Sequence, residues 1–123
     1  MMEAAIETRF AMTYEELQAK VLAFRDERDW AQFHTPKDLA ISISLEAAEL
    51  LECFQWSGAD IDAAKKREQM TEELADVMNY CILMADTLDI DLLEAVSAKI
   101  EKNAAKYPVD KAKGSSAKYN ELQ

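Results

Sequence analysis

The chain has 123 residues and a formal net charge of −10, and half of its residues are hydrophobic. This length suits a single domain with a modest core, and the presence of only two glycines and two prolines favours an all-α protein. The strong negative charge argues against nonspecific binding to nucleic acid, which depends on basic surfaces.

Capping residues and helix breakers predict four helices. Thr13 followed by Glu16 is a capping box that begins the first helix. Thr35 before Pro36 begins the second, and the Ser57–Gly58 pair ends it. The predicted helices span residues 14–30, 36–56, 63–88 and 91–106.

The chain is expected to divide into three segments. Residues 1–12 carry no strong signal and are predicted to be frayed. Residues 13–107 form the helical domain, which ends before Pro108 because a proline disfavours helix in the residue before it. Residues 108–123 form a loose basic tail. Because the second and third helices are apolar on more than one face, we expect a four-to-five-helix bundle that forms a homo-oligomer through helix packing.

The cysteines and the hydropathy pattern bear on location. Cys53 and Cys81 lie in apolar helical stretches, which is typical of reduced, buried thiols. The N-terminus lacks the pattern of a secretory signal, and the longest uncharged apolar run, residues 77–85, is too short to span a bilayer. We therefore expect a cytoplasmic protein that has no membrane partner.

Two pairs of acidic residues share a three-residue spacing, Glu46 with Glu49 and Glu73 with Asp76. On a helix this spacing places both carboxylates on one face. The first pair lies in an apolar stretch, where a carboxylate is costly unless it is paired or bound to a cation. A short connection, residues 57–62, can bring the two pairs opposite each other. The pattern indicates a four-carboxylate metal cage, and a solvated acidic face is the alternative.

The ligand types point to the metal. Carboxylate oxygens favour Mg²⁺, with Mn²⁺ as the alternative, over Zn²⁺. A di-iron bundle would need Glu-x-x-His pairs, and the only histidine, His34, lies elsewhere. Carboxylate-bound Mg²⁺ is commonly completed by phosphates and water, so the expected chemistry is hydrolysis of a phosphate ester or anhydride.

The two acidic pairs and their flanks resemble the MazG-like, all-α nucleoside triphosphate pyrophosphohydrolases, in the branch that contains the dCTP pyrophosphatases. The resemblance covers roughly residues 14–122. Beyond the acidic pairs, it is carried by residues 28–36, 50–56, 72–77, 106–109 and 114–119.

The resemblance implies Mg²⁺-dependent hydrolysis of a nucleoside triphosphate, dCTP or a related dNTP, to the monophosphate and pyrophosphate. It also implies a dimer or tetramer with active sites between subunits, and we favour the tetramer. By residue, it implies metal ligands at Glu46, Glu49, Glu73 and Asp76. Glu49 and Glu46 would be catalytic, with Glu49 orienting or deprotonating the attacking water. The implied substrate-binding residues are Trp30, Trp56, Tyr80, Asn103 and Lys106.

Each of these positions also has an ordinary structural interpretation. The tryptophans and Tyr80 are equally typical of a core or an interface, and basic rows such as that containing Lys106 are usually solvated. Some relatives have a histidine where this chain has Val21, so dUTP or a modified nucleotide is an alternative substrate. For the whole protein, the alternative is a non-enzymatic helical module for oligomerisation or partner binding.

Overall fold

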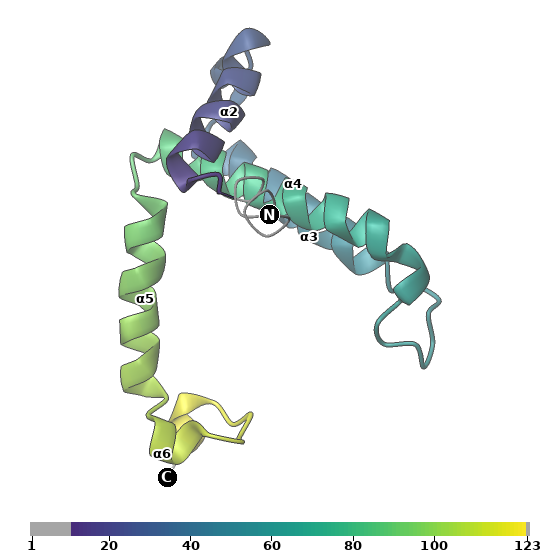
Figure 1. Ribbon diagram of the computed structural model, residues 1–123, viewed down its shortest axis with the longest axis vertical. Helices are drawn as coiled ribbons and strands as arrows, with labels where there is room; N and C mark the ends of the chain where they lie inside the picture. Colours follow the sequence, from purple (N-terminus) through teal and green to yellow (C-terminus); the bar gives the residue numbers. More distant parts are fainter. Residues whose placement is uncertain (1–10, 123) are drawn as a thin grey trace, which may run out of the picture. The chain divides into compact units, whose positions relative to one another are not determined.

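The computed structural model describes residues 11–122, and over this range it contains helices and no strands (Figure 1). The prediction of an all-α fold is confirmed. The predicted frayed segment lies outside the described residues except for Ala11 and Met12, which are not helical. The helices are α2 (Tyr14–Glu27), α3 (Pro36–Glu52), α4 (Arg67–Thr87), α5 (Leu92–Lys106) and α6 (Val109–Ala112).

Side-chain caps fix the starts of three helices. The side chains of Thr13, Thr35 and Asp91 each accept a hydrogen bond of 3.1 Å from the backbone N–H three residues further on. Each bond satisfies one of the N–H groups that the first turn of a helix leaves without a partner. The predicted starts of α2, α3 and α5 are therefore confirmed.

Three predicted helix boundaries are wrong by three or four residues, and a non-glycine residue with a left-handed backbone lies near each of them. α2 ends at Glu27 instead of near Trp30, since Asp29 has a φ of 55°. α3 ends at Glu52 and the chain continues in turns to Trp56, whose φ is 67°. α4 begins at Arg67, after a 3₁₀ turn, instead of near residue 63.

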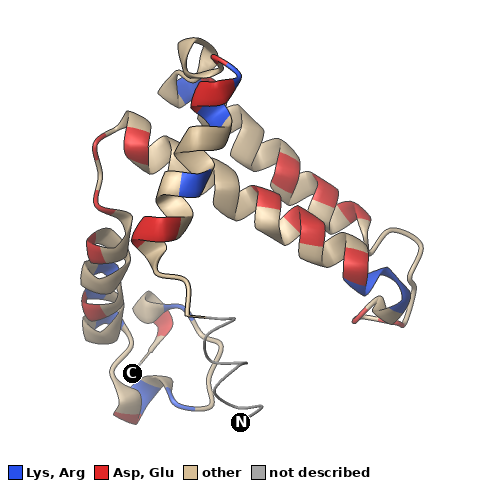
Figure 2. Cartoon of the chain, turned by 45° about the horizontal axis from the view of Figure 1, so that its top comes forward, with Lys and Arg blue, Asp and Glu red and all other residues tan. Residues whose placement is uncertain are grey.

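The chain divides into two compact units, Met1–Asp89 and Ile90–Gln123. In the first, α3 and α4 run side by side as an antiparallel pair, and α2 packs on α4 (Figure 1). Acidic residues recur along both helices of the pair (Figure 2). Among residues 11–122, the buried residues are few and apolar: Leu39, Cys53, Ala63, Ile82, Leu83 and Ala85.

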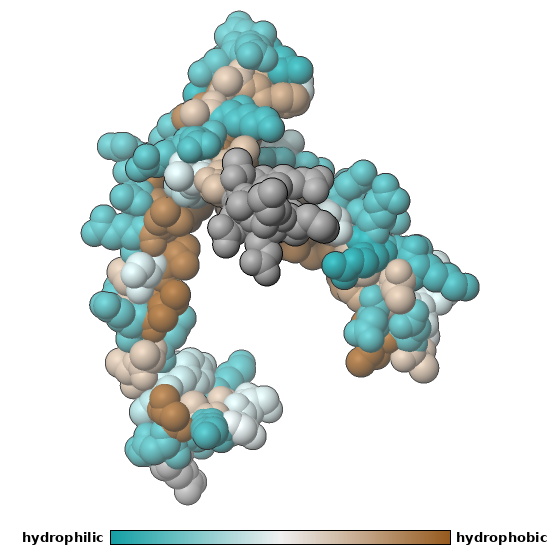
Figure 3. All heavy atoms as spheres, viewed as in Figure 1, coloured by the Kyte–Doolittle hydropathy of each residue, from teal (hydrophilic) through white to brown (hydrophobic). Residues whose placement is uncertain are grey.

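The second unit contains α5 and the C-terminal segment, which is more ordered than the predicted loose tail. The segment forms α6 and a 3₁₀ turn at Tyr119–Glu121. The Tyr119 ring packs edge-on against Tyr107 with a centroid separation of 6.4 Å, and Lys106 Nζ lies 5.0 Å from the Tyr119 centroid. These contacts between distant residues explain why a local sequence pattern did not reveal the fold of this segment. On α5 itself, apolar side chains gather along one side (Figure 3).

The structure agrees with the prediction of free thiols at both cysteines. Cys53 is buried, Cys81 is half-buried, and both are free thiols. Among residues 11–122, no helix combines the length and the apolar character that crossing a membrane requires.

Candidate functional site

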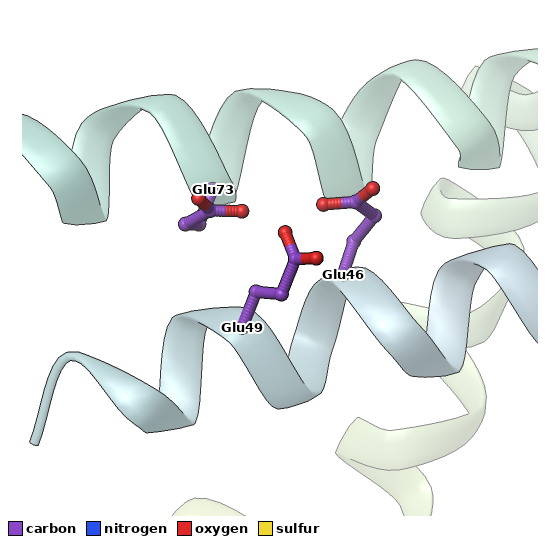
Figure 4. Close-up of side chains that lie close together, drawn as sticks. All are labelled: Glu46, Glu49 and Glu73. Atoms are coloured by element: carbon purple, nitrogen blue, oxygen red, sulfur yellow. The ribbon is translucent and has the colours of Figure 1, made fainter. Parts of the chain in front are cut away.

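Three glutamates meet between α3 and α4. Glu46 and Glu49 project from α3, and Glu73 projects toward them from α4 (Figure 4). One carboxylate oxygen of each residue lies within 4.8 Å of the other two. A Mg²⁺ ion holds oxygen ligands at about 2.1 Å, so opposite ligands stand about 4.2 Å apart. The carboxylate cluster, as we call Glu46, Glu49 and Glu73, therefore has the dimensions of a site for a small divalent cation.

Burial distinguishes the members of the carboxylate cluster. Glu46 and Glu73 are half-buried, whereas Glu49 is exposed. Oε2 of Glu46 and Oε2 of Glu73 are both buried and have no hydrogen-bond partner among the described residues. A buried carboxylate oxygen without a partner is unfavourable. The donors present therefore fit a hard cation, which would satisfy both oxygens at once.

The electrostatics of the cluster agree with this fit. Burial raises the pKa of Glu46 above its ordinary value, and the neighbouring Glu49 carboxylate adds to the rise. The pKa of Glu73 is raised to about 7, chiefly through its hydrogen bond with Glu49 and also through burial. No ion pair of the described residues involves a cluster carboxylate. The cluster thus holds a proton more tightly than isolated carboxylates do, unless a cation takes its place.

Asp76, the fourth predicted ligand, lies one turn after Glu73 on α4 but outside the cluster of three. Its charge contributes to the raised pKa of Glu46, so the two side chains interact. Its Oδ1 accepts a long hydrogen bond of 3.5 Å from Asn79 Nδ2. The structure therefore gathers three of the four predicted ligands and leaves Asp76 within electrostatic reach of them.

A cavity of about 370 Å³ lies between α2 and α4, and Asp76 is part of its wall. Two other predicted site residues, Trp30 and Tyr80, also line it. The remaining wall is mostly apolar and is formed by Leu17, Lys20, Val21, Phe24, Arg25, His34, Asn79 and Leu83. The cavity offers aromatic and aliphatic surface with a few polar groups, which is typical of small-molecule sites. Through Asp76, the wall of the cavity continues on the same helix to Glu73.

His34 lines this cavity but has the features of a structural residue. Burial lowers its pKa, and the nearby charge of Arg25 adds to the effect, so the imidazole is neutral at pH 7. Its Nδ1 is buried and has no hydrogen-bond partner among residues 11–122.

The other predicted substrate-binding residues lie outside the cavity. Trp56 follows α3 at the end opposite Trp30 and is 92% exposed. Asn103 and Lys106 are exposed residues of α5 in the second unit. Asn103 borders a shallow hollow on α5 together with Lys99.

Sequence reasoning missed Phe24, Arg25 and Asn79 as cavity residues. A signal for Phe24 was present, since it extends the apolar row of Leu17 and Val21 along α2. Arg25 gave no such signal, because it looks like one of many charged residues at the end of α2. Its partner Asp86, 61 residues away, is evident only in the fold.

Comparison with known proteins adds three findings. A model of the MazG-like family matches residues 41–122. dCTP pyrophosphatase 1 of Mus musculus and that of Homo sapiens are each 37% identical to this chain over 115 residues, which cover 89% of the chain and 68% of the relative. The crystal structure of a pyrophosphatase from Archaeoglobus fulgidus is 46% identical, with a TM-score of 0.71, covering 76% of this chain and 91% of that chain.

Proposed function

The chain belongs to the MazG-like family, and from this membership and its carboxylate cluster we infer that it is a nucleoside triphosphate pyrophosphohydrolase. Its substrate is a deoxynucleoside triphosphate, dCTP or a close relative, and its products are the nucleoside monophosphate and pyrophosphate. The relatives named dCTP pyrophosphatase support this choice of substrate. The observation that carries the inference is the cluster of three glutamates with two buried, unpartnered oxygens.

We assign a divalent metal ion to Glu46, Glu49 and Glu73, with Asp76 as the fourth ligand. The all-oxygen donor set supports Mg²⁺, with Mn²⁺ as the alternative. A bound ion of this kind neutralises phosphate charge and lowers the pKa of a coordinated water.

Among the cluster residues, Glu49 is the most accessible to bulk water, because it is exposed while Glu46 and Glu73 are half-buried. We propose that Glu49 orients the attacking water and accepts its proton, and that Glu46 assists through its contact with Glu49. The water oxygen bonds to the α-phosphorus as the bond to the bridging oxygen breaks, which releases pyrophosphate.

The aromatic residues would hold the base. Trp30 and Tyr80 line the cavity between α2 and α4, and aromatic faces stack on any base. Trp56 is exposed and has a left-handed backbone that is unfavourable for a bulky residue. These two features support a contact between Trp56 and the nucleotide or a second subunit. On α5, we propose Asn103 and Lys106 as nucleotide-contacting residues, with Lys106 as a charge for the phosphates.

We propose that the protein functions as a homo-oligomer, a tetramer in preference to a dimer. Large apolar side chains remain exposed on every long helix of the described chain: Phe24, Ile41, Leu45, Leu51, Leu74, Met78, Leu93, Val96 and Ile100. Such extensive exposed apolar surface is typical of helices that pack against another subunit. Sedimentation as a monomer at micromolar concentration would contradict the proposal. The free thiols of both cysteines are consistent with the proposed cytoplasmic location.

The test of the proposed function is the Glu49→Gln variant, which keeps the shape of the side chain and removes its charge. We expect turnover of dCTP with Mg²⁺ to fall at least about a hundredfold, with helix content unchanged by circular dichroism. Glu52→Gln, an exposed residue three positions further along α3, is the matched control and should keep wild-type activity.

Product analysis and binding separate the remaining alternatives. Release of orthophosphate in place of pyrophosphate would overturn the reaction type, and wild-type activity in Glu49→Gln would overturn the role of this residue. A non-enzymatic module predicts no heat when the protein is titrated with Mg²⁺ and a non-hydrolysable dNTP, whereas the enzyme predicts binding of both.

A further inference from the structure

One ion pair joins α2 to α4. Arg25 Nη1 donates a hydrogen bond of 2.8 Å to Asp86 Oδ2, although the two residues are 61 positions apart. The side chain of Arg25 is only 14% exposed and that of Asp86 is 35% exposed. The other ion pairs of the described residues connect sequence neighbours, Arg25 with Asp26 and Arg28 with Glu27. The Arg25–Asp86 pair is therefore the one among them that fixes two helices relative to each other.

The backbone of Arg25 also holds Trp30. After α2 ends, the Arg25 carbonyl accepts hydrogen bonds from the N–H of Arg28, at 3.2 Å, and from the N–H of Trp30, at 3.1 Å. The Trp30 ring then packs edge-on against Phe24, with a centroid separation of 5.8 Å. Trp30 is thus attached to the last turn of α2, at the residue whose side chain reaches α4.

At the other end of the ion pair, Asp86 lies on α4, the helix that carries the rest of the site. α4 bears Glu73 of the carboxylate cluster, as well as Asp76 and Tyr80 of the cavity wall. Arg25 itself lines the same cavity. A charge-assisted hydrogen bond that is largely withdrawn from water is stronger than an exposed ion pair. The Arg25–Asp86 pair therefore links the last turn of α2, to which the Trp30 backbone is bonded, to the helix that carries Glu73.

We propose that Arg25 and Asp86 are positioning residues for substrate binding: their ion pair holds Trp30 against the cavity in which the base stacks. This inference rests on the proposed function, because it takes the cavity as the base site. Neither residue touches the reacting phosphates. Breaking the pair therefore weakens binding of the nucleotide and leaves the chemical step unchanged.

The test compares two variants that each remove one partner of Arg25. Asp86→Ala removes the partner on α4, and we expect the KM for dCTP with Mg²⁺ to rise about tenfold while kcat stays within about twofold. Asp26→Ala removes the partner on α2 itself, also at 2.8 Å, and is the matched control. Because Asp26 connects no second helix, its variant should keep the wild-type KM.

A charge reversal tests whether the pair itself is responsible. The double variant Arg25→Asp/Asp86→Arg recreates the interaction in the opposite sense and should bring KM back to within about threefold of wild type. If circular dichroism shows that Asp86→Ala has lost helix content, the double variant provides the test of the positioning role instead. A KM that is still raised tenfold in the double variant overturns the proposal.

The outcomes for the two proposals are distinct. An unchanged KM in Asp86→Ala, an equal rise in Asp26→Ala, or a loss confined to kcat would each overturn the positioning role. In all three cases the wild type remains active and the Glu49→Gln variant remains inactive, so the proposed function stands. An inactive wild type would overturn the proposed function together with the inference that rests on it.

Discussion

Binding of Mg²⁺ to the carboxylate cluster should release protons, in an amount that depends on pH. A metal ligand must be deprotonated, and the pKa of Glu73 is raised to about 7. At pH 6.5 about three quarters of the metal-free molecules carry this proton, and at pH 8 about a tenth do. Binding should therefore release about 0.8 proton at pH 6.5 and about 0.1 at pH 8. The raised pKa of Glu46 adds to the release at the lower pH.

Calorimetric titration with Mg²⁺ measures this release when it is repeated in buffers of different ionisation enthalpy. Glu73→Gln should lose most of the release at pH 6.5. Glu72→Gln, which alters the exposed preceding residue on α4, is the matched control and should keep it. An equal release at both pH values, or none at pH 6.5, would refute the assignment of Glu73 as a metal ligand with a raised pKa.

Three further predictions concern stability. Because the pKa of Glu73 is higher in the folded chain than its ordinary value of 4.5, the folded state binds more protons between about pH 4.5 and 7. The metal-free protein should therefore lose stability across this window as pH rises. We expect this loss to appear as a lower Tm at pH 8 than at pH 5 when both are measured in the presence of a chelator. Trp56→Asn should leave the free energy of unfolding in urea unchanged or raise it by about 0.5–1 kcal/mol, because Asn accepts the left-handed backbone of this exposed position. The same variant should lower kcat/KM for dCTP at least about tenfold. Ile82→Ala, at a position with 0% exposure, should reduce the free energy of unfolding by about 3 kcal/mol. Ile61→Ala, at 81% exposure, should change it by less than about 0.5 kcal/mol, and equal effects of the two would contradict the assigned core.

The starts of α2, α3 and α5 were predictable because they depend on local chemistry. Thr13, Thr35 and Asp91 cap helices through bonds to residues three positions away, and such spacing is visible in the sequence. The ends of α2 and α3 were not predictable, because Asp29 and Trp56 adopt a left-handed conformation that is expected of glycine.

In the candidate site, too, the features that depend on local spacing were predictable and those that depend on helix packing were not. The spacing of Glu46, Glu49 and Glu73 was enough to predict that they meet, because two antiparallel neighbours bring matching faces together. The ion pair of Arg25 and Asp86 was not predictable, since neither residue has a distinctive neighbourhood in the sequence. Long-range polar pairs depend on how the helices pack, which hydrophobic periodicity does not specify.

The carboxylate cluster has a consequence for folding kinetics. Its members come from α3 and α4, which are consecutive long helices of one antiparallel pair, so the cluster is completed when these two helices dock. As the pair closes, the mutual repulsion of the carboxylates opposes docking unless protons or a cation screen it. We therefore expect the rate of folding at alkaline pH to increase with Mg²⁺ concentration. In that case the ion would act as a template for the nascent hairpin well before it takes part in turnover.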